Sequence, residues 1–217
     1  MSIYHIRSAF MILAIGLMLA AWWRIPPPRP RAFLLMGVIA LLALPLEIAG
    51  YITTLKHINN SWAYNLFTWL EFLLVLALIS VQQPRLRNVA IVFGALGTTA
   101  MAWDCSVADP STDMLIEGIT FMSLLLALLL SIALWNMAST STVALHRLPE
   151  FWLFMGLLLY FGGLLPVVAM ARYVYTKDTA LVTVLWTIVP LLCALRYLLA
   201  GYACWALARQ RRMEQNE

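Results

Sequence analysis

The chain has 217 residues, of which 63% are hydrophobic and 11% are charged, and its formal net charge is +4 at pH 7. A soluble domain carries about a quarter charged residues, so this composition excludes an ordinary soluble enzyme and indicates an integral membrane protein. Only short segments separate the apolar runs, which leaves no room for a kinase, nuclease or nucleotide-binding domain.

Seven apolar runs are long enough to cross a membrane, which takes about 20 residues for about 30 Å of hydrocarbon. In chain order, the predicted helices cover about residues 8–24, 32–55, 62–82, 87–104, 113–137, 150–173 and 180–207. We therefore predict an all-α membrane protein, a seven-transmembrane-helix bundle that forms a single domain over residues 1–217. The final segment, QRRMEQNE, is polar and is expected to be disordered.

Positive charge is concentrated in every second loop and in the C-terminal tail. The arginines of these segments are Arg24, Arg29, Arg31, Arg85, Arg87, Arg147, Arg209, Arg211 and Arg212. The alternate loops hold Lys56, Arg172 and Lys177, and one of them, 104–113, is acidic. This alternation follows the positive-inside rule. It predicts an external N-terminus and a cytoplasmic C-terminus, which the odd number of helices also requires.

The same distribution argues against nucleic acid as a partner, because the arginines flank membrane spans instead of forming one basic surface. The expected partner is the lipid bilayer, and the expected location is the inner (cytoplasmic) membrane of a bacterial cell, crossed several times.

Three charged residues lie well inside the predicted spans: Glu47, Glu71 and Arg196. A charge inside a bilayer is costly unless it is paired or hydrated, so each is a candidate for a functional site. Glu71 lies roughly 14 Å from the external start of its helix, and Arg196 lies roughly 20 Å from Arg209, too far to reach the cytoplasmic interface. We predict that Glu71 and Arg196 form a buried ion pair, which either fixes their helices together or belongs to a binding site.

Glu47 lies in the external half of the second helix. It follows Pro45, which opens the backbone hydrogen-bonding ladder, and it has no obvious cation of its own. Polar residues at similar depth on the second, third and seventh helices predict a ligand-binding pocket there, with Glu47 as the functional carboxylate. The predicted ligand-binding residues are Glu47, Tyr51, Tyr64, Asn65, Thr68, Glu71 and Arg196. Glu117 is a further residue that could rim this pocket.

Other chemistries find little support in the sequence. His5, His57 and His146 are scattered along the chain, so neither a metal site nor a haem site is predicted. The three cysteines are expected to be free thiols. A retinal Schiff base requires a lysine, and the last predicted helix has none. We therefore predict no cofactor and no catalytic residue.

Several short motifs resemble those of a group of small bacterial seven-helix membrane proteins of unknown function. They are Glu47-x-x-Gly50-Tyr51, Asn60, Tyr64-Asn65 with Glu71, Phe151-Trp152 and Tyr160-Phe161-x-Gly163. Members of that group are sometimes encoded near sensor histidine kinases, so the resemblance implies a sensing role and assigns no catalytic residue. A fragment, Pro45-Leu46-Glu47, is similar to the Pro-x-Glu element of membrane lycopene cyclases, but the paired acidic residue and the following aromatics are missing here.

Three functions remain open on the sequence alone. The leading hypothesis is a receptor-like or ligand-binding bundle that senses a small or lipidic ligand and passes helix shifts to a cytoplasmic or membrane signalling partner. That partner would contact the proline-rich connector 24–31 or the loop 139–147. The alternative is a proton- or ion-coupled transporter of small solutes that uses Glu47 and Glu71, and the third is an intramembrane enzyme acting on a lipid or isoprenoid.

Overall fold

The computed structural model describes residues 3–175 and 179–215, and over these residues it is all-helical with no strand. Seven of its helices are long and apolar enough to cross a membrane. They are α1 (Ile3–Trp23), α2 (Arg31–Leu55), α3 (Ser61–Gln82), α4 (Arg87–Val107), α5 (Ile116–Thr140), α6 (Pro149–Tyr175) and α7 (Thr179–Glu214). Two single-turn 3-10 helices, η1 (Pro84–Leu86) and η2 (Leu145–Arg147), precede α4 and α6.

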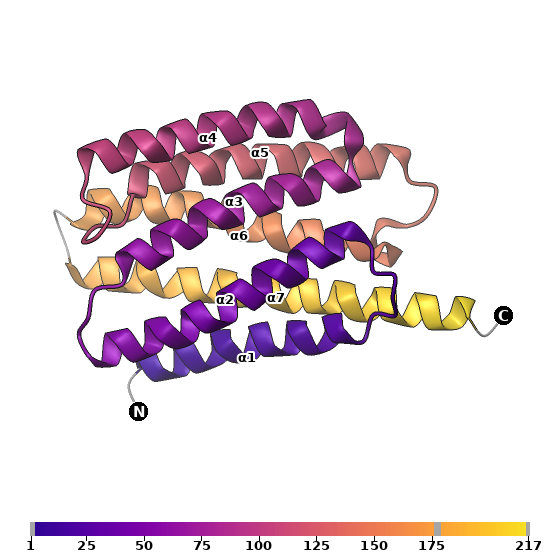
Figure 1. Cartoon of the computed structure of the whole chain (residues 1–217), viewed down its shortest axis with the longest axis horizontal. Helices are drawn as coiled ribbons and strands as arrows, with labels where there is room; N and C mark the ends of the chain where they lie inside the picture. Colours follow the sequence, from indigo (N-terminus) through magenta and orange to yellow (C-terminus); the bar gives the residue numbers. More distant parts are fainter. Residues whose placement is uncertain (1–2, 176–178, 216–217) are drawn as a thin grey trace.

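Consecutive helices run in opposite directions and pack side by side (Figure 1). The ring closes because α1 packs against α7. Helix α3 also contacts α5 directly, so α4 lies outside the ring that the other six helices form (Figure 1). The described ends of the chain lie at opposite ends of the bundle. Six helices therefore surround the centre of the ring.

The apolar character of these segments explains both the helices and their outward faces. In hydrocarbon every backbone polar group must be satisfied within its own segment, which an α-helix achieves. Large side chains such as Leu13, Leu41 and Val92 point outward and are more than half exposed, whereas Phe33 and Phe154 are fully buried. This pattern suits a bundle surrounded by lipid instead of water.

Glycines allow α7 to pack closely against α6 on one side and α1 on the other. A Cβ on Gly156 of α6 would lie 3.2 Å from the Arg196 carbonyl oxygen, and a Cβ on Gly201 of α7 would lie 3.2 Å from the Met18 Cα. Helices in membranes commonly pack through small residues that let their backbones approach closely, because the hydrophobic effect does not drive helices together within lipid. Arg196 is consequently held on one of the most tightly packed helices of the bundle.

Several helices extend beyond the apolar runs that predicted them, whereas α5 begins at Ile116, after the predicted start at 113. Helix α1 begins at Ile3 and α7 ends at Glu214, because helices continue through polar residues at the membrane interface. The prediction of a disordered C-terminal segment was therefore wrong for residues 210–214. Gln210 Nε2 donates to the Arg147 carbonyl oxygen at 3.0 Å, and Arg211 Nη1 donates to the Pro26 carbonyl oxygen at 3.2 Å, so this last part of α7 is tied to two loops.

The two ends of the bundle differ in charge. The nine arginines of the predicted cytoplasmic loops and tail, from Arg24 to Arg212, all lie at the end that holds the C-terminus (Figure 1). Lys56 lies at the opposite end, Lys177 lies outside the described residues, and the side chain of Arg172 is not described.

The acidic segment between α4 and α5 is well ordered by hydrogen bonds. Asp104 lies in the last turn of α4, is buried, and accepts a 2.9 Å hydrogen bond from the backbone N–H of Gly118 at the start of α5. Asp109 accepts hydrogen bonds from the N–H and hydroxyl of Ser111, which hold the pKa of Asp109 below its ordinary value. Cys105, which was expected in a loop, also lies in the last turn of α4, and its thiol is free.

Candidate ligand-binding cavity

A cavity of about 410 Å³ lies inside the ring, toward the end opposite the C-terminus. Its walls come from α1, α2, α3, α5, α6 and α7, together with Met114 just before α5. The polar residues that line it are Arg7, Ser8, Glu47, Tyr64, Thr68, Glu71, Tyr160, Cys193, Arg196 and Tyr197. The remaining lining is apolar and includes Phe67, Ile119, Leu164 and Val168. This mixture of apolar wall and a few polar groups is typical of small-molecule sites.

The predicted ion pair between α3 and α7 is present. Arg196 Nη1 lies 2.7 Å from Glu71 Oε1, and the two side chains are 1% and 2% exposed. The N–H of Nη1 is not aligned with that oxygen as a hydrogen bond requires, so the attraction is mainly between the charges. The prediction from helical depth is therefore confirmed as a contact, and the cation of α7 compensates the buried carboxylate of α3.

Two tyrosines hold the rest of the Arg196 guanidinium group. Nη2 donates a 2.8 Å hydrogen bond to the Tyr197 hydroxyl. The guanidinium carbon lies 4.1 Å from the centre of the Tyr160 ring and 4.5 Å from the centre of the Tyr197 ring, both within cation–π range. Arg196 Nε, in contrast, is buried and has no hydrogen-bond partner among the described residues.

Glu47 is half-buried and meets α3 through Tyr64. The Tyr64 hydroxyl donates to Glu47 Oε2 at 3.4 Å, which is long for a hydrogen bond of this kind. This approach requires Gly50, since a Cβ at that position would collide with the Tyr64 hydroxyl. Glu47 also lies within electrostatic range of Arg196 and Glu71. The carboxylate therefore has lone pairs to offer to a molecule in the cavity.

Five of the seven residues predicted for ligand binding line the cavity: Glu47, Tyr64, Thr68, Glu71 and Arg196. Tyr51 and Asn65 do not line it, and neither does Glu117, which is exposed near the start of α5.

Asn65 supports the loop between α4 and α5 instead. Its Nδ2 donates to the carbonyl oxygens of Pro110 and Asp113 at 3.2 and 2.8 Å, and its Oδ1 accepts from the N–H of Leu115 at 3.1 Å. Asn65 is among the residues predicted to bind a ligand, but its side-chain hydrogen bonds go to this loop, whose path the sequence does not show.

Tyr160, Tyr197 and Arg7 are cavity residues that reasoning from the sequence did not select for the site. With 26 aromatic residues (9 Trp, 8 Tyr and 9 Phe) in the chain, an individual tyrosine carries little signal. The adjacency of Tyr197 to the intramembrane Arg196 was the available clue, because aromatic rings commonly accompany buried guanidinium groups.

The polar groups of the cavity differ in kind. Within the described residues, no three His, Cys, Asp or Glu side chains come together in a way that could hold a metal ion. Cys193 and Cys204 are buried free thiols on α7. The groups that converge are the carboxylate of Glu47, the positive charge of Arg196, and tyrosine side chains, which together can hold a polar head in an apolar surrounding.

Comparisons with known proteins add no assignment. No family model, no curated protein and no solved structure matches this chain.

Proposed function

We propose that the protein crosses the inner membrane of a bacterial cell seven times, with its N-terminus outside and its C-terminus in the cytoplasm. The concentration of nine arginines at the C-terminal end of the bundle supports this orientation, since arginine-rich ends remain on the cytoplasmic side.

Cysteine labelling is expected to report this orientation. In a Cys105→Ser background, which removes the exposed native thiol and leaves buried Cys193 and Cys204, single cysteines would be placed at Ser111 and Thr142. Both positions are exposed and lie at opposite ends of the bundle. A membrane-impermeant maleimide should label position 111 in intact spheroplasts and position 142 only after lysis. Labelling of both from one side would contradict the seven-helix topology.

We further propose that the protein is a receptor-like or ligand-binding bundle whose cavity holds a small amphiphilic or lipidic ligand with a hydroxyl group. The observation that carries this proposal is a carboxylate on the cavity wall. Half-buried Glu47 lines the cavity and is held by one long hydrogen bond among the described residues. A hydroxyl group in the cavity can donate to a free lone pair of Glu47. Its hydrocarbon part would lie along the apolar wall near Ile119 and Leu164.

A ligand in this cavity would touch helices that are able to bend. Pro45 in α2, Pro166 in α6 and Pro190 in α7 each interrupt the helical hydrogen bonding, and Pro190 lines the cavity. Small changes in these bends would move the C-terminal end of the bundle. A signalling partner would read that movement at the connector 24–31 or the loop 139–147.

Replacing Glu47 with Gln is expected to weaken ligand retention about 10- to 100-fold, the range for losing a hydrogen bond to a charged group. Glutamine keeps the size of the side chain but replaces one acceptor oxygen with a donor group. The measurement is native mass spectrometry of protein extracted from its own membrane, which reports the mass of any molecule that stays bound. Thermal unfolding in the same detergent should shift little, because Glu47 is only half-buried.

Glu150→Gln is the matched control, since this glutamate lies in the first turn of α6 at the opposite end of the bundle. It should retain the molecule as the wild type does. Equal retention in Glu47→Gln and wild type would remove Glu47 from the site, and a wild-type protein that carries no bound molecule would contradict the proposal itself.

A second candidate function is coupled transport of a small solute. It is favoured by two carboxylates, Glu47 and Glu71, that face one cavity among proline-bent helices. Proteoliposomes that take up solute only with an imposed proton gradient, and lose this uptake in Glu47→Gln, would favour the transporter over the receptor.

A further inference from the structure

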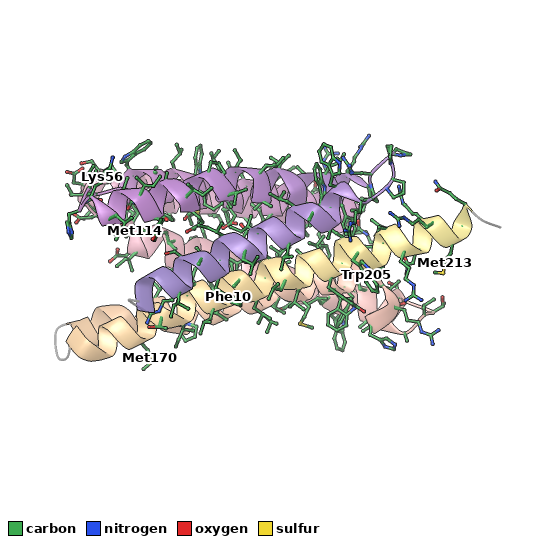
Figure 2. The ribbon with its side chains drawn as sticks, turned by 90° about the horizontal axis from the view of Figure 1, so that it is seen from below. Phe10, Lys56, Met114, Met170, Trp205 and Met213 are labelled. Carbon is green, nitrogen blue, oxygen red and sulfur yellow. The ribbon has the colours of Figure 1, made fainter. Side chains whose placement is uncertain are left out.

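A second hollow lies at the other end of the molecule, between the end of α1 and the last turns of α7. Its volume is about 220 Å³, and Arg24, Trp205, Ala208, Arg209, Arg212 and Met213 line it. Three of its six lining residues are arginines and none is acidic. Figure 2 shows Trp205 and Met213 on the C-terminal part of α7, near the end where many nitrogen atoms gather.

Five of the arginines at this end, those near α1 and α7, fall into two groups. Arg29 stacks over the Trp22 ring at 4.3 Å and donates to the Ile25 carbonyl oxygen, and Arg211 donates to the Pro26 carbonyl oxygen. These two guanidinium groups are used to fix the connector between α1 and α2.

The hollow's own arginines have no such partners. Within the described part of the chain, the side chains of Arg24, Arg209 and Arg212 make no hydrogen bond or ion pair with another residue. Arg209 lies 5.8 Å from the centre of the Trp205 ring, a contact that leaves its N–H groups available. Three positive charges thus converge on a space whose lining holds no carboxylate, which favours an anion.

An apolar stripe runs from the hollow along the outward face of α7. Its residues recur every three or four positions and are all exposed: Leu191, Leu195, Leu198, Tyr202 and Trp205. The stripe covers roughly 21 Å of helix, comparable to a large part of one acyl chain. Tyr202 and Trp205 stand where the stripe meets the arginines, as aromatic residues do at membrane interfaces.

We propose that this hollow binds the phosphate head of an anionic phospholipid, with one acyl chain lying along the stripe on α7. Basic pockets on the cytoplasmic side of membrane helices recognise anionic head groups in this way. Arg209 and Arg212 are one turn apart on α7, and Arg24, which directly follows α1, lines the same hollow, so the phosphate would join the first and last helices of the ring where it closes.

The test is native mass spectrometry of the full-length protein in detergent with phosphatidylglycerol or phosphatidylcholine of identical acyl chains. The wild type should retain phosphatidylglycerol preferentially. Arg209→Gln/Arg212→Gln should lower that retention by roughly 10- to 30-fold, as expected for the loss of two cationic contacts near a membrane surface. The control, Arg85→Gln/Arg87→Gln, removes the same charge from exposed positions at the same end of the bundle and should behave as the wild type.

Three results would overturn the proposal. Equal loss in both double variants would mean that overall charge attracts the lipid without a site. Unchanged retention in Arg209→Gln/Arg212→Gln would remove these residues from lipid binding. Displacement of phosphatidylglycerol by an equal concentration of inorganic phosphate would identify a free phosphate, not a lipid, as the ligand. All four substituted arginines are exposed, so folding should survive every variant.

Discussion

Arg196→Met is expected to lower the free energy of unfolding by about 3–5 kcal/mol, the range for removing one member of a buried ion pair. The variant would leave Glu71 buried without its cation, and the Tyr197 hydroxyl would lose the donor that now lies 2.8 Å away. Glu47 lies within electrostatic range of Arg196, so the same substitution also removes a positive charge from its surroundings.

The double variant Arg196→Met/Glu71→Gln should be more stable than Arg196→Met alone, because no unpaired charge then remains at this position. Thermal and denaturant unfolding of the wild type, both single variants and the double variant complete a double-mutant cycle, whose interaction energy measures the coupling of the pair. Arg87→Met, an exposed arginine at the C-terminal end of the bundle, controls for the loss of an arginine as such. Additive effects in the cycle would show that the two charges do not stabilise each other.

The ion pair was predictable because depth inside a membrane follows from counting residues. Each helix advances about 1.5 Å per residue and begins at a boundary that hydropathy marks. Glu71 and Arg196 have no route to water along their own helices, so mutual pairing was the low-energy arrangement. The same reasoning gave the seven spans, although it missed the extension of α1 at its start and of α4 and α7 at their ends, and it began the fifth span at 113, whereas α5 begins at Ile116.

Which residues of a helix face the cavity was harder to predict than how deep in the membrane they lie. Tyr64, Thr68 and Glu71 recur at helical spacing and do share one wall of the cavity. Asn65 is one residue, or about 100°, away from Tyr64 around a helix of 3.6 residues per turn, and that rotation takes it out of the cavity. The rotation itself could be calculated from the sequence, but the position of the neighbouring loop could not.

Trp22 illustrates the same difficulty. A tryptophan at the end of a span is typical of the aromatic belt at a membrane interface, and Trp23 is 74% exposed as such a residue would be. Trp22 is buried, and its indole N–H donates to the Phe33 carbonyl oxygen at 2.8 Å. The choice between the two neighbours depends on how α2 returns alongside α1, which is a property of tertiary packing.

Asn65→Ala is expected to destabilise the end of the bundle opposite the C-terminus by about 2–4 kcal/mol, since three backbone groups lose their partner at once and each buried loss costs about 1–3 kcal/mol before water compensates part of it. The affected groups are the carbonyl oxygens of Pro110 and Asp113 and the N–H of Leu115. The Leu115 N–H is the most costly, because this hydrogen bond is fully buried.

Hydrogen exchange over residues 108–115, together with thermal unfolding, measures this effect. Exchange should accelerate throughout the segment in Asn65→Ala.

Asn65→Asp should be no more stable than Asn65→Ala, because it keeps an acceptor for the Leu115 N–H but turns a second oxygen toward two carbonyl oxygens. Asn59→Ala is the graded control, since Asn59 makes two exposed hydrogen bonds, donating to the Thr112 carbonyl oxygen and accepting from the Ser61 N–H, and it should cost about 1 kcal/mol. Below the unfolding transition, Asn65→Ala should retain any bound molecule as the wild type does, because Asn65 does not line the cavity. Loss of that molecule with unchanged exchange at 108–115 would return Asn65 to the binding site and show that the loop is ordered by other contacts.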